Sequence, residues 1–328
     1  MSEAPSIAVV IPSWNSLDLL PRCLDSLQGQ GVEIEAMVVD NGSTDGSPAY
    51  LEERDVPHLS LPRNVGFAAA VNLGAREVLA AAVLALNADT ALEPGCAGRL
   101  LDALEADPSL AGVQPRILQL GSEPGTAPVL DAARLYSAGQ ALTRDGRAFE
   151  LGAGEMQSAA HLRPGEVFGV CGAACLLRRE LFDDLGGYDE SYFAFYEDVD
   201  LNVRARIAGW RFSYVPEAVV WHVGNAFWQQ GFERPGAENA RLVARNRLAT
   251  QVKFMPLAAV PRIAAVEVGS LARAASQRRL GATLRGKLEA LRRLPRLLRE
   301  RRRLRREGDP SLARGWLGAS PEAEPHRP

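Results

Sequence analysis

Hydrophobic and polar positions change period repeatedly over the first 117 residues. Short runs rich in Val, Ile and Leu alternate with stretches of helical spacing, a pattern typical of βαβ units around a mainly parallel sheet. Helices of roughly twelve residues are expected to begin near Ser16, Ser47, Phe67 and Glu93. The predicted strands span residues 6–12, 32–40, 58–62, 81–87 and 111–117. The pattern therefore predicts an α/β fold.

The pattern weakens between residues 121 and 164, where Gly, Pro and Ala are frequent and an irregular excursion is expected. A strand is predicted to begin at Val167 and to be followed by a short helix that ends at Gly186-Gly187. A helix over 191–208 and strands over 210–216 and 218–224 are predicted next. After Asn239 the pattern is helical and increasingly rich in arginine. The proline-containing segment 308–328 is predicted to be disordered.

Composition divides the 328 residues into two parts of different charge. The hydrophobic content of 47% is ample for a large core, and the net charge is only −3. Residues 262–306 nevertheless carry +12, which leaves −15 for the remainder. We therefore expect one domain over residues 1–250, a basic helical extension over 251–307 and the tail over 308–328.

The sequence favours a cytoplasmic protein that does not span a membrane. No basic segment followed by a long apolar stretch occurs in the first thirty residues. The apolar run Val78–Leu86 has nine residues, against roughly twenty for a membrane-spanning helix. The four cysteines lie in apolar surroundings, which suits a reducing compartment. Cys171 and Cys175 have a spacing found in zinc sites, but without a second cysteine pair they are expected to be core residues.

The predicted strand that ends at Asp40 is followed by turn-forming residues, in the sequence VVDNGSTDGS. Val38 and Val39 indicate a buried strand, and the Asn, Gly and Ser residues after Asp40 indicate an abrupt loop. Ligands bind at such strand ends in open α/β sheets. Pro12-Ser13-Trp14-Asn15 marks a similar transition from strand to helix, although a capped helix explains it equally well.

Two further strand ends carry residues that can bind a metal ion. Asn87 and Asp89 are separated by one residue and therefore point to the same side, as a hard divalent cation requires. Asn and Asp are also common in turns, so a simple turn is the alternative explanation of Asn87 and Asp89. His222 closes a β-branched strand, and a histidine near acidic groups can also be a metal ligand.

Three carboxylates, Glu197, Asp198 and Asp200, lie within four residues at the predicted start of a helix. The helix dipole stabilises acidic residues at this position, so part of this cluster needs no functional explanation. However, the aromatic residues before them, including Tyr196, would remove water from at least one carboxylate. This raises its affinity for a proton and suits it to act as a general base.

Taken together, these motifs resemble glycosyltransferase family 2, and they are most similar to its bacterial rhamnosyltransferase-like members. The resemblance covers about residues 6–247 in the right order. It rests on PSWN, VVDNGSTDGS, NVGFAAAVNLG from Asn64, LNAD, GGYDE and YEDVDL. It implies a GT-A fold, with a nucleotide-binding half over 1–117 and an acceptor or catalytic half over 165–225.

The resemblance also implies roles for individual residues. Asp198 would be the catalytic base, with support from Glu197, Asp200 and Tyr196. Asp89 would hold Mg²⁺ or Mn²⁺ and His222 would complete the ligands, whereas Asn87 departs from the strict Asp-x-Asp motif. The donor would be bound by the remaining matched residues: Pro12, Trp14, Asn15, Asp40, Asn41, Asn64, Gly66, Asn72 and Asn87.

These roles fit an inverting transfer of a sugar from a nucleoside diphosphate to a hydroxyl group. The metal stabilises the departing diphosphate and the carboxylate accepts the acceptor's proton. A dTDP or UDP sugar is the expected donor, with rhamnose suggested by the resemblance. A glycan or a lipid-linked acceptor in cell-surface polysaccharide synthesis is the expected partner. The alternative is an inactive module that only binds sugar nucleotides. A dehydrogenase is excluded because no Gly-x-Gly-x-x-Gly follows the first strand.

The basic segment 280–306 alternates leucines and arginines at helical spacing and is interrupted by Pro295. This composition favours peripheral binding to the anionic inner face of the cell membrane. Nucleic acid is disfavoured because no aromatic residues are interleaved with the arginines. A solvated helix packed against the acidic domain is the other interpretation.

Overall fold

The computed structural model of the chain describes residues 5–120, 130–224 and 236–318. Twelve strands are assigned within these ranges. They are β1 (Ile7–Ser13), β2 (Ile34–Asp40), β3 (His58–Ser60), β4 (Ala82–Leu86), β5 (Thr90–Leu92), β6 (Leu110–Gln119), β7 (Leu135–Ser137), β8 (Gln140–Leu142), β9 (Ala148–Glu150), β10 (Gly165–Val167), β11 (Ala174–Arg178) and β12 (Arg211–His222).

The α-helices surround these strands. They are α1 (Leu20–Asp25), α2 (Ser47–Glu53), α3 (Phe67–Glu77), α4 (Cys96–Ala106), α5 (Arg179–Asp184), α6 (Glu197–Ile207), α8 (Ala237–Phe254), α9 (Val260–Ser276), α10 (Leu280–Arg292), α11 (Leu294–Glu307) and α12 (Pro310–Arg314). Short 3₁₀ turns cover Leu130–Ala132, Ala159–Leu162, Glu190–Tyr192 and Leu257–Ala259.

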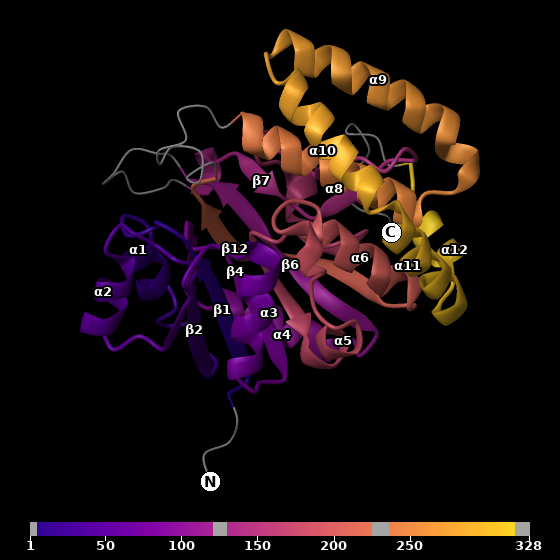
Figure 1. Cartoon of the computed structure of the whole chain (residues 1–328). Coiled ribbons are helices and arrows are strands. Elements are labelled where there is room, and N and C mark those ends of the chain that lie inside the picture. The colour runs from indigo at the N-terminus through magenta and orange to yellow at the C-terminus, as the bar shows by residue number, and fades with distance from the viewer. Residues whose placement is uncertain (1–4, 121–129, 225–235, 319–328) are drawn as a thin grey trace.

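The central sheet has the strand order β10-β12-β6-β11-β4-β1-β2-β3, with β5 beside β12 and β7 beside β6 (Figure 1). Strands β3, β2, β1 and β4 are parallel, as the sequence predicts. Strand β11 runs antiparallel between β4 and β6, so the sheet as a whole is mixed. Because β11 begins where β4 ends, the residues before β11 lie at the same sheet edge as Asn87, whose N–H donates to the carbonyl of Ala173 (2.9 Å).

The two faces of the sheet have separate cores. Along β1, Ile7, Val9 and Ile11 contribute to one core and Val10 to the other, which is the two-residue alternation of a buried strand. The first core contains side chains of α1, α2 and α4, and the second contains side chains of α3, α5 and α6. All of these β1 residues are fully buried.

Several local predictions need correction. The predicted helix over 191–208 begins only at Glu197, because Phe193, Phe195 and Tyr196 have left-handed backbone angles that no α-helix accommodates. The two strands predicted over 210–224 form one strand, β12, with an irregularity between Val215 and Val219. The excursion predicted over 121–164 contains β7, β8 and β9, although residues 121–129 lie outside the described residues.

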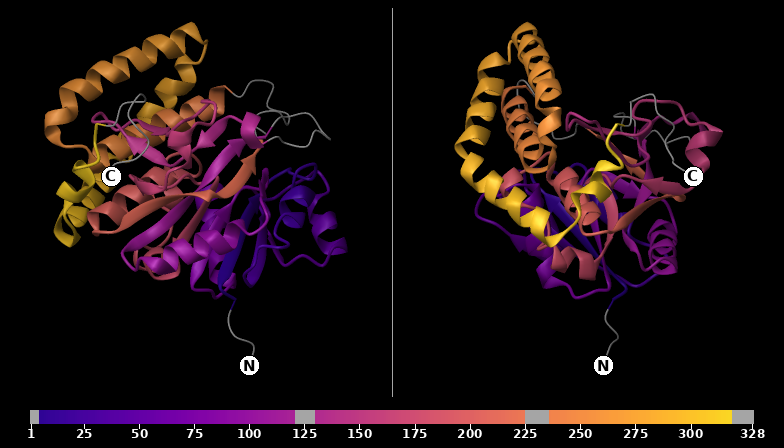
Figure 2. Two further views of the ribbon diagram at one scale, coloured as in Figure 1. Left: turned by 180° about the vertical axis from the view of Figure 1, so that it is seen from behind. Right: turned by 90° about the vertical axis from the view of Figure 1, so that its right-hand side faces the viewer.

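The C-terminal helices α8 to α12 lie together on one side of the molecule, with α9 outermost (Figures 1 and 2). The expected boundary at residue 250 falls inside α8, against which α10 and α11 pack. Pro295 occupies the first turn of α11, where its missing N–H costs no hydrogen bond. The tail predicted to be disordered contains α12, whose Ala313 is buried in a cluster with α6 residues. Residues 319–328 lie outside the described residues.

No helix in the described part of the chain combines the length and the apolar character that a membrane crossing requires.

Candidate active site

The loops after β1 and β2 are tied to each other at the carboxyl edge of the sheet. Ser13 and Asp40 are direct neighbours in the parallel register, so the residues that follow them meet. The Asn15 N–H donates to Ser43 Oγ (2.9 Å), and the Thr44 N–H donates to Asn15 Oδ1 (2.8 Å). Asn15 has a φ of +50°, a conformation that asparagine tolerates. The predicted Pro12–Asn15 and Asp40–Asn41 segments therefore form one rim.

Asp40 is buried at this rim, and the Ser43 N–H approaches its carboxylate oxygens at 3.3 and 3.4 Å. The neighbouring amides shape the backbone. Asn41 Oδ1 accepts from the Val65 N–H (2.7 Å), and Asn64 Oδ1 accepts from the Gly66 N–H (2.8 Å). Asn41 and Asn64 thus build the wall beside Asp40.

Gly66 connects this rim to the segment before Glu197. Its φ is +93°, and a Cβ at this position would lie 2.5 Å from the Phe193 carbonyl oxygen. Only glycine fits such a close approach. The Phe193 carbonyl accepts from the Ala68 N–H (3.2 Å), which holds the two segments together.

Asn72 was predicted to line the donor side, but its side chain is fully engaged elsewhere. Asn72 Nδ2 donates to the Tyr188 carbonyl (2.9 Å) and to Glu190 (3.1 Å), while Oδ1 accepts from the Tyr188 N–H (2.9 Å). These bonds join α3 to the Gly-Gly-Tyr-Asp-Glu segment. Asn72 therefore positions that segment.

Asp89 and His222 face each other across the end of the sheet. His222 Nε2 lies 3.0 Å from Asp89 Oδ1, and Asn87 Nδ2 lies 3.5 Å from the same nitrogen. Strand β5, which follows Asp89, pairs with β12 and brings the two residues together. Both side chains are largely buried, with 15% and 5% of their area exposed.

This pair fits a divalent cation. A carboxylate oxygen and an imidazole nitrogen are suitable metal ligands, and they lie close enough to share one ion. His222 Nδ1 is buried without a hydrogen-bond partner among the described residues. Among the described residues, the polar contacts of the imidazole are therefore made by Nε2, the nitrogen that faces Asp89.

Asp198 lies in the first turn of α6, within a set of hydrogen-bond donors. Its Oδ2 accepts from Gln140 Nε2 (2.7 Å) and from the Gly172 N–H (3.0 Å), and its Oδ1 accepts from the Val199 N–H (2.8 Å). Burial raises the pKa of Asp198, and these three donors act in the opposite direction. The carboxylate is thus fixed in orientation and only partly exposed to solvent.

Two other carboxyl groups near Asp198 have pKa values above their usual range. Burial, followed by the charge of Asp198, raises the pKa of Glu197 well above its usual range. Glu197 Oε2 is buried and has no hydrogen-bond partner in the described structure. The same two causes raise the pKa of Glu150 to about 7.

Tyr136 connects the Asp89–His222 pair to Asp198. Its ring packs edge-on against His222, with 4.3 Å between the ring centres. Burial raises the pKa of Tyr136 first, and the negative charges of Asp89 and Asp198 raise it further. The next residue, Ser137, donates to Glu150 Oε2 (2.6 Å), and Gln140 Nε2 donates to both Glu150 (2.9 Å) and Asp198 (2.7 Å). The two predicted centres therefore share one region of the molecule.

The segment before Asp198 is strained and is held from α8. Phe193, Phe195 and Tyr196 have φ values of +66°, +68° and +68°, a region that is costly for residues with bulky side chains. Asn246 Nδ2 donates to the carbonyls of Tyr192, Ala194 and Phe195 at 2.9, 2.8 and 2.7 Å. One buried amide thus restrains the whole segment.

Asp200, predicted to support the site, anchors α6 through buried ion pairs. Its oxygens accept from Arg204 Nε (2.7 Å) and from the buried ammonium of Lys253. Lys253 also pairs with Asp189 (3.1 Å) and Glu300 (3.2 Å). Tyr196 packs in the cluster beside α6, and its hydroxyl accepts from the Ala148 N–H (3.4 Å).

Glu150, Cys171 and Asp198 also lie together, with ligand atoms within 4.8 Å of one another. A cation there would compete with N–H and O–H donors already directed at these carboxylates from Gln140, Gly172 and Ser137. Burial raises the pKa of the Cys171 thiol well above its usual range, which disfavours the thiolate that a metal needs. Asp89 and His222 are therefore the better metal candidates. Cys171 and Cys175 are buried, as expected.

A sequence model of glycosyl transferase family 2 matches residues 8–186, more than half of the chain. The chain belongs to this family. The matched range includes Asp40 and Asp89, while Asp198 and His222 lie beyond it.

Two curated proteins of Mycobacterium tuberculosis are similar in sequence to this chain. It is 32% identical over 211 residues to N-acetylglucosaminyl-diphospho-decaprenol L-rhamnosyltransferase of Mycobacterium tuberculosis, over 58% of this chain and 66% of the relative. It is 32% identical over 219 residues to pre-mycofactocin glycosyltransferase of the same species, over 66% of this chain and 42% of the relative. The chain thus spans less than two thirds of the length of each relative. The predicted likeness to bacterial rhamnosyltransferases is confirmed.

The fold is similar to that of GalNAc-T7, whose crystal structure contains UDP, GalNAc and Mn²⁺. The two superpose with a TM-score of 0.60 over 77% of this chain and 49% of GalNAc-T7, at 18% sequence identity. At this identity the likeness concerns the fold alone. It confirms the predicted GT-A class of this glycosyltransferase.

The sequence did not indicate Gln140, Glu150 or Asn246 as site residues of this glycosyltransferase. Gln140 and Glu150 lie in the excursion that looked irregular, and Asn246 lies in a helix remote in sequence from Asp198. Their side chains reach the site only through tertiary contacts. The strands that carry Gln140 and Glu150 have only three residues each, too few for a readable alternation of apolar and polar positions.

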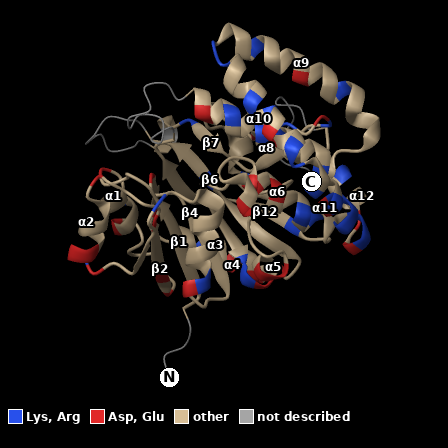
Figure 3. Cartoon of the chain, viewed as in Figure 1, with Lys and Arg blue, Asp and Glu red and all other residues tan. Residues whose placement is uncertain are grey.

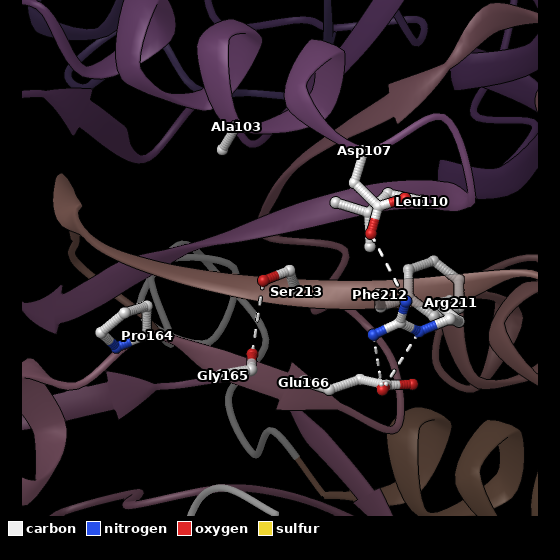
Figure 4. Close-up of a pocket in the computed structure, with 9 residues that line it drawn as sticks. All are labelled: Ala103, Asp107, Leu110, Pro164, Gly165, Glu166, Arg211, Phe212 and Ser213. Atoms are coloured by element: carbon white, nitrogen blue, oxygen red, sulfur yellow. Dashed lines mark hydrogen bonds and ion pairs between the residues drawn. The ribbon is translucent and has the colours of Figure 1, made fainter. Parts of the chain in front are cut away.

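A separate pocket lies between α4, β6, β10 and β12 (Figure 4). It contains none of the predicted site residues. Its charged residues are engaged with each other, because Arg211 pairs with Glu166 (3.0 Å) and Asp107 (3.4 Å). We assign no function to it.

Proposed function

We propose that the protein is an inverting glycosyltransferase that moves a sugar from a nucleoside diphosphate to a hydroxyl group of a glycan or lipid-linked acceptor. The observation that carries the proposal is that consecutive residues contact the two centres: the Gly172 N–H donates to Asp198 (3.0 Å), and the Ala173 carbonyl accepts from the N–H of Asn87 (2.9 Å), which lies beside the Asp89–His222 pair. A metal-binding pair and a base are the two groups that this transfer requires, and they must act on one substrate.

The donor side of the proposal rests on Asp40 and the rim around it. A buried carboxylate can accept the imide N–H of uracil or thymine, which supports a UDP or dTDP sugar. The Pro12–Asn15 segment, Asn41, Asn64 and Gly66 form the surrounding backbone. Rhamnose is the suggested sugar because a curated relative is named as an L-rhamnosyltransferase. The name of the same relative suggests a decaprenol-linked acceptor.

Asp89 and His222 would hold the divalent cation, with Asn87 beside them. A site with both imidazole and carboxylate ligands suits Mn²⁺ better than Mg²⁺, which prefers oxygen ligands. When bound, the cation would stabilise the negative charge of the departing diphosphate. The chain's own contribution is to keep both ligands at the sheet edge on which Asp40 also lies.

Asp198 would accept the proton of the attacking hydroxyl. The acceptor O–H bond breaks as the new bond from its oxygen to the anomeric carbon forms, and the diphosphate leaves with the electron pair of the old bond. Attack from the face opposite the diphosphate inverts the anomeric configuration, as in inverting glycosidases. Burial strengthens the affinity of Asp198 for this proton.

Peripheral binding to the inner face of the cell membrane completes the proposal. Lys and Arg residues gather on α10 and α11 (Figure 3). On α10, Leu280, Leu284, Leu288 and Leu291 recur at helical spacing and are 38–53% exposed. Leucines beside arginines are typical of helices that lie in an anionic membrane interface. Part of the segment 280–306 is packed on its own domain, since Leu297 and Leu304 of α11 are buried.

A panel of nucleotide sugars tests the proposed function. Thermal stabilisation by one donor in the presence of Mn²⁺, followed by transfer of its sugar to a lipid-linked acceptor, is the expected result. An inactive binding module would be stabilised by a donor but would neither hydrolyse nor transfer it. Absence of both stabilisation and turnover with every donor would contradict the proposal.

A further inference from the structure

The segment 121–164, predicted to be irregular, places the side chains of Gln140 and Glu150 beside Asp198. Strands β8 and β9 form an antiparallel hairpin in which Gln140 and Glu150 are direct partners. Gln140 Nε2 donates to Glu150 Oε1 (2.9 Å) across the hairpin and to Asp198 Oδ2 (2.7 Å) in α6. A single amide group therefore joins two carboxyl groups. Neither the family match nor the motifs in the sequence assign a role to these residues.

The orientation of the Gln140 amide follows from its neighbours. Asn202 Oδ1 accepts from the Val170 N–H (3.2 Å), so Asn202 Nδ2 must be the atom that donates to Gln140 Oε1 (2.8 Å). The Nε2 group of Gln140 is then the end that faces Glu150 and Asp198. Gln140 and Asn202 are both buried, which excludes exchange of these bonds with bulk water.

This arrangement distinguishes the two oxygens of Asp198. Oδ2 accepts two hydrogen bonds, from Gln140 and from the Gly172 N–H. Oδ1 accepts one, from the Val199 N–H. A carboxylate oxygen has two lone-pair directions. Oδ1 is therefore the oxygen with capacity for the proton of an incoming hydroxyl.

A carboxylate oxygen of Glu150 lies within 4.8 Å of one of Asp198, so the charges of the two groups interact. Ser137 Oγ donates to Glu150 Oε2 (2.6 Å), and Gln140 donates to Oε1, so the carboxyl group is held at both ends. Its titratable neighbours are Asp198, Cys171 and Tyr136. Burial and the charge of Asp198 raise the pKa of Glu150 to about 7. Its charge therefore changes near neutral pH.

We propose that Gln140 and Glu150 are positioning residues for the base: Gln140 directs Asp198 Oδ1 toward the acceptor, and Glu150 sets the basicity of Asp198 by its charge. The inference rests on the proposed role of Asp198. An ionised Glu150 disfavours a second negative charge beside it and so raises the affinity of Asp198 for a proton. Protonation of Glu150 removes this effect. The transfer rate should therefore rise as the pH increases through about 7.

Steady-state kinetics across neutral pH test the inference in wild type, Gln140→Leu and Glu150→Gln. Gln140→Leu should lower kcat at least about tenfold and leave the donor KM within about twofold, since it misaligns the base without touching the donor site. Glu150→Gln should lower the maximal rate and move the inflection from near pH 7 to more acidic pH. Glu155→Gln replaces an exposed carboxylate of the same excursion, 3.3 Å from His161, and is the matched control that should behave as wild type.

Infrared titration provides a second readout that needs no turnover. Wild type should show a protonated carboxyl band that disappears as the pH rises through about 7, and this band should be absent from Glu150→Gln. Identical pH profiles and identical bands in wild type and Glu150→Gln would overturn the inference while leaving the proposed function intact. A wild-type protein that transfers no sugar from any donor would instead overturn the proposed function, and the inference with it.

Discussion

His222 Nε2 lies 3.0 Å from Asp89 Oδ1, although the two residues are 133 positions apart in the chain. The short strand after Asp89 pairs with the end of β12 and creates this contact. If the pair holds the cation, loss of either side chain should weaken metal binding. We expect Asp89→Asn and His222→Ala each to lower the affinity for Mn²⁺, measured with UDP present, by at least about tenfold.

His58 offers a matched control for the metal experiment. It begins β3, and its Nδ1 contacts the Val56 carbonyl (2.8 Å). His58→Ala should leave the Mn²⁺ affinity at the wild-type value. Equal affinities in wild type, Asp89→Asn and His222→Ala would show that the cation, if it binds, is held elsewhere.

Asn246 should be important for both stability and rate. Its amide restrains three carbonyls of the strained segment before Asp198. Asn246→Leu removes this donor from the carbonyls of Ala194 and Phe195, while the Tyr192 carbonyl still accepts from Arg245 (2.6 Å), and the loss should cost about 1–3 kcal/mol of unfolding free energy. The rate should also fall because the segment that precedes Asp198 is released. Urea unfolding and initial rates measure the two effects.

The exposed residue Gln277, which ends α9, is a control for the loss of an amide. Gln277→Leu should change the unfolding free energy by less than about 0.5 kcal/mol. If Asn246→Leu were as stable and as active as this control, the hydrogen bonds of Asn246 would have no consequence for the site.

The buried ion network around Lys253 should make stability sensitive to acid. Burial opposes the charged form of Asp189, but Lys253 and neighbouring donors hold the pKa of Asp189 well below its usual range. Because its pKa is lower in the folded than in the unfolded state, the stabilisation is present above about pH 4 and is lost as the pH falls further. Denaturant melts at decreasing pH should show this loss.

Lys253→Met removes the cation and leaves Asp189, Asp200 and Glu300 without their shared partner. We expect a cost of about 3–5 kcal/mol in unfolding free energy. Arg303→Met, at an exposed ion pair with Glu307, should cost less than about 1 kcal/mol. Comparable costs for the two substitutions would mean that the buried network contributes no special stability.

The exposed leucines of α10 predict how the protein binds membranes. The double variant Leu284→Ser/Leu288→Ser should bind vesicles of phosphatidylglycerol and phosphatidylcholine at least about tenfold more weakly, since two apolar side chains no longer enter the interface. Wild type should prefer these vesicles to pure phosphatidylcholine. Leu79→Ser removes a still more exposed leucine from a different part of the surface and should have no effect. Undiminished binding of the double variant would contradict the proposed membrane face.

The parts of the fold that depend on local pattern could be predicted from the sequence. Val38, Val39 and Asp40 mark the end of β2 by polarity alone, and the same applies to Leu86 and Asn87 at the end of β4. The antiparallel direction of β11 could not be predicted, because its apolar run is the same in either direction. The left-handed backbone at Phe193 and Phe195 also has no sequence signal, since tertiary bonds from Asn246 impose it.

The candidate site also combines residues that the sequence could indicate with residues that it could not. Asp89 and His222 could be proposed as partners from their chemistry and a family resemblance, and the structure brings them together. Asn72 was assigned to the donor side from the same resemblance, yet its hydrogen bonds go to the Tyr188 backbone. Gln140 could not be found because its importance depends on the pairing of β8 with β9.

The central claim is that Asp198 is the base of a transfer whose donor is bound by separate residues. The most direct test compares wild type and Asp198→Asn in sugar transfer and in donor affinity, under the same Mn²⁺ concentration. We predict a rate at least about a hundredfold lower in Asp198→Asn, with donor affinity near that of wild type. Equal transfer rates in the two proteins would contradict the account.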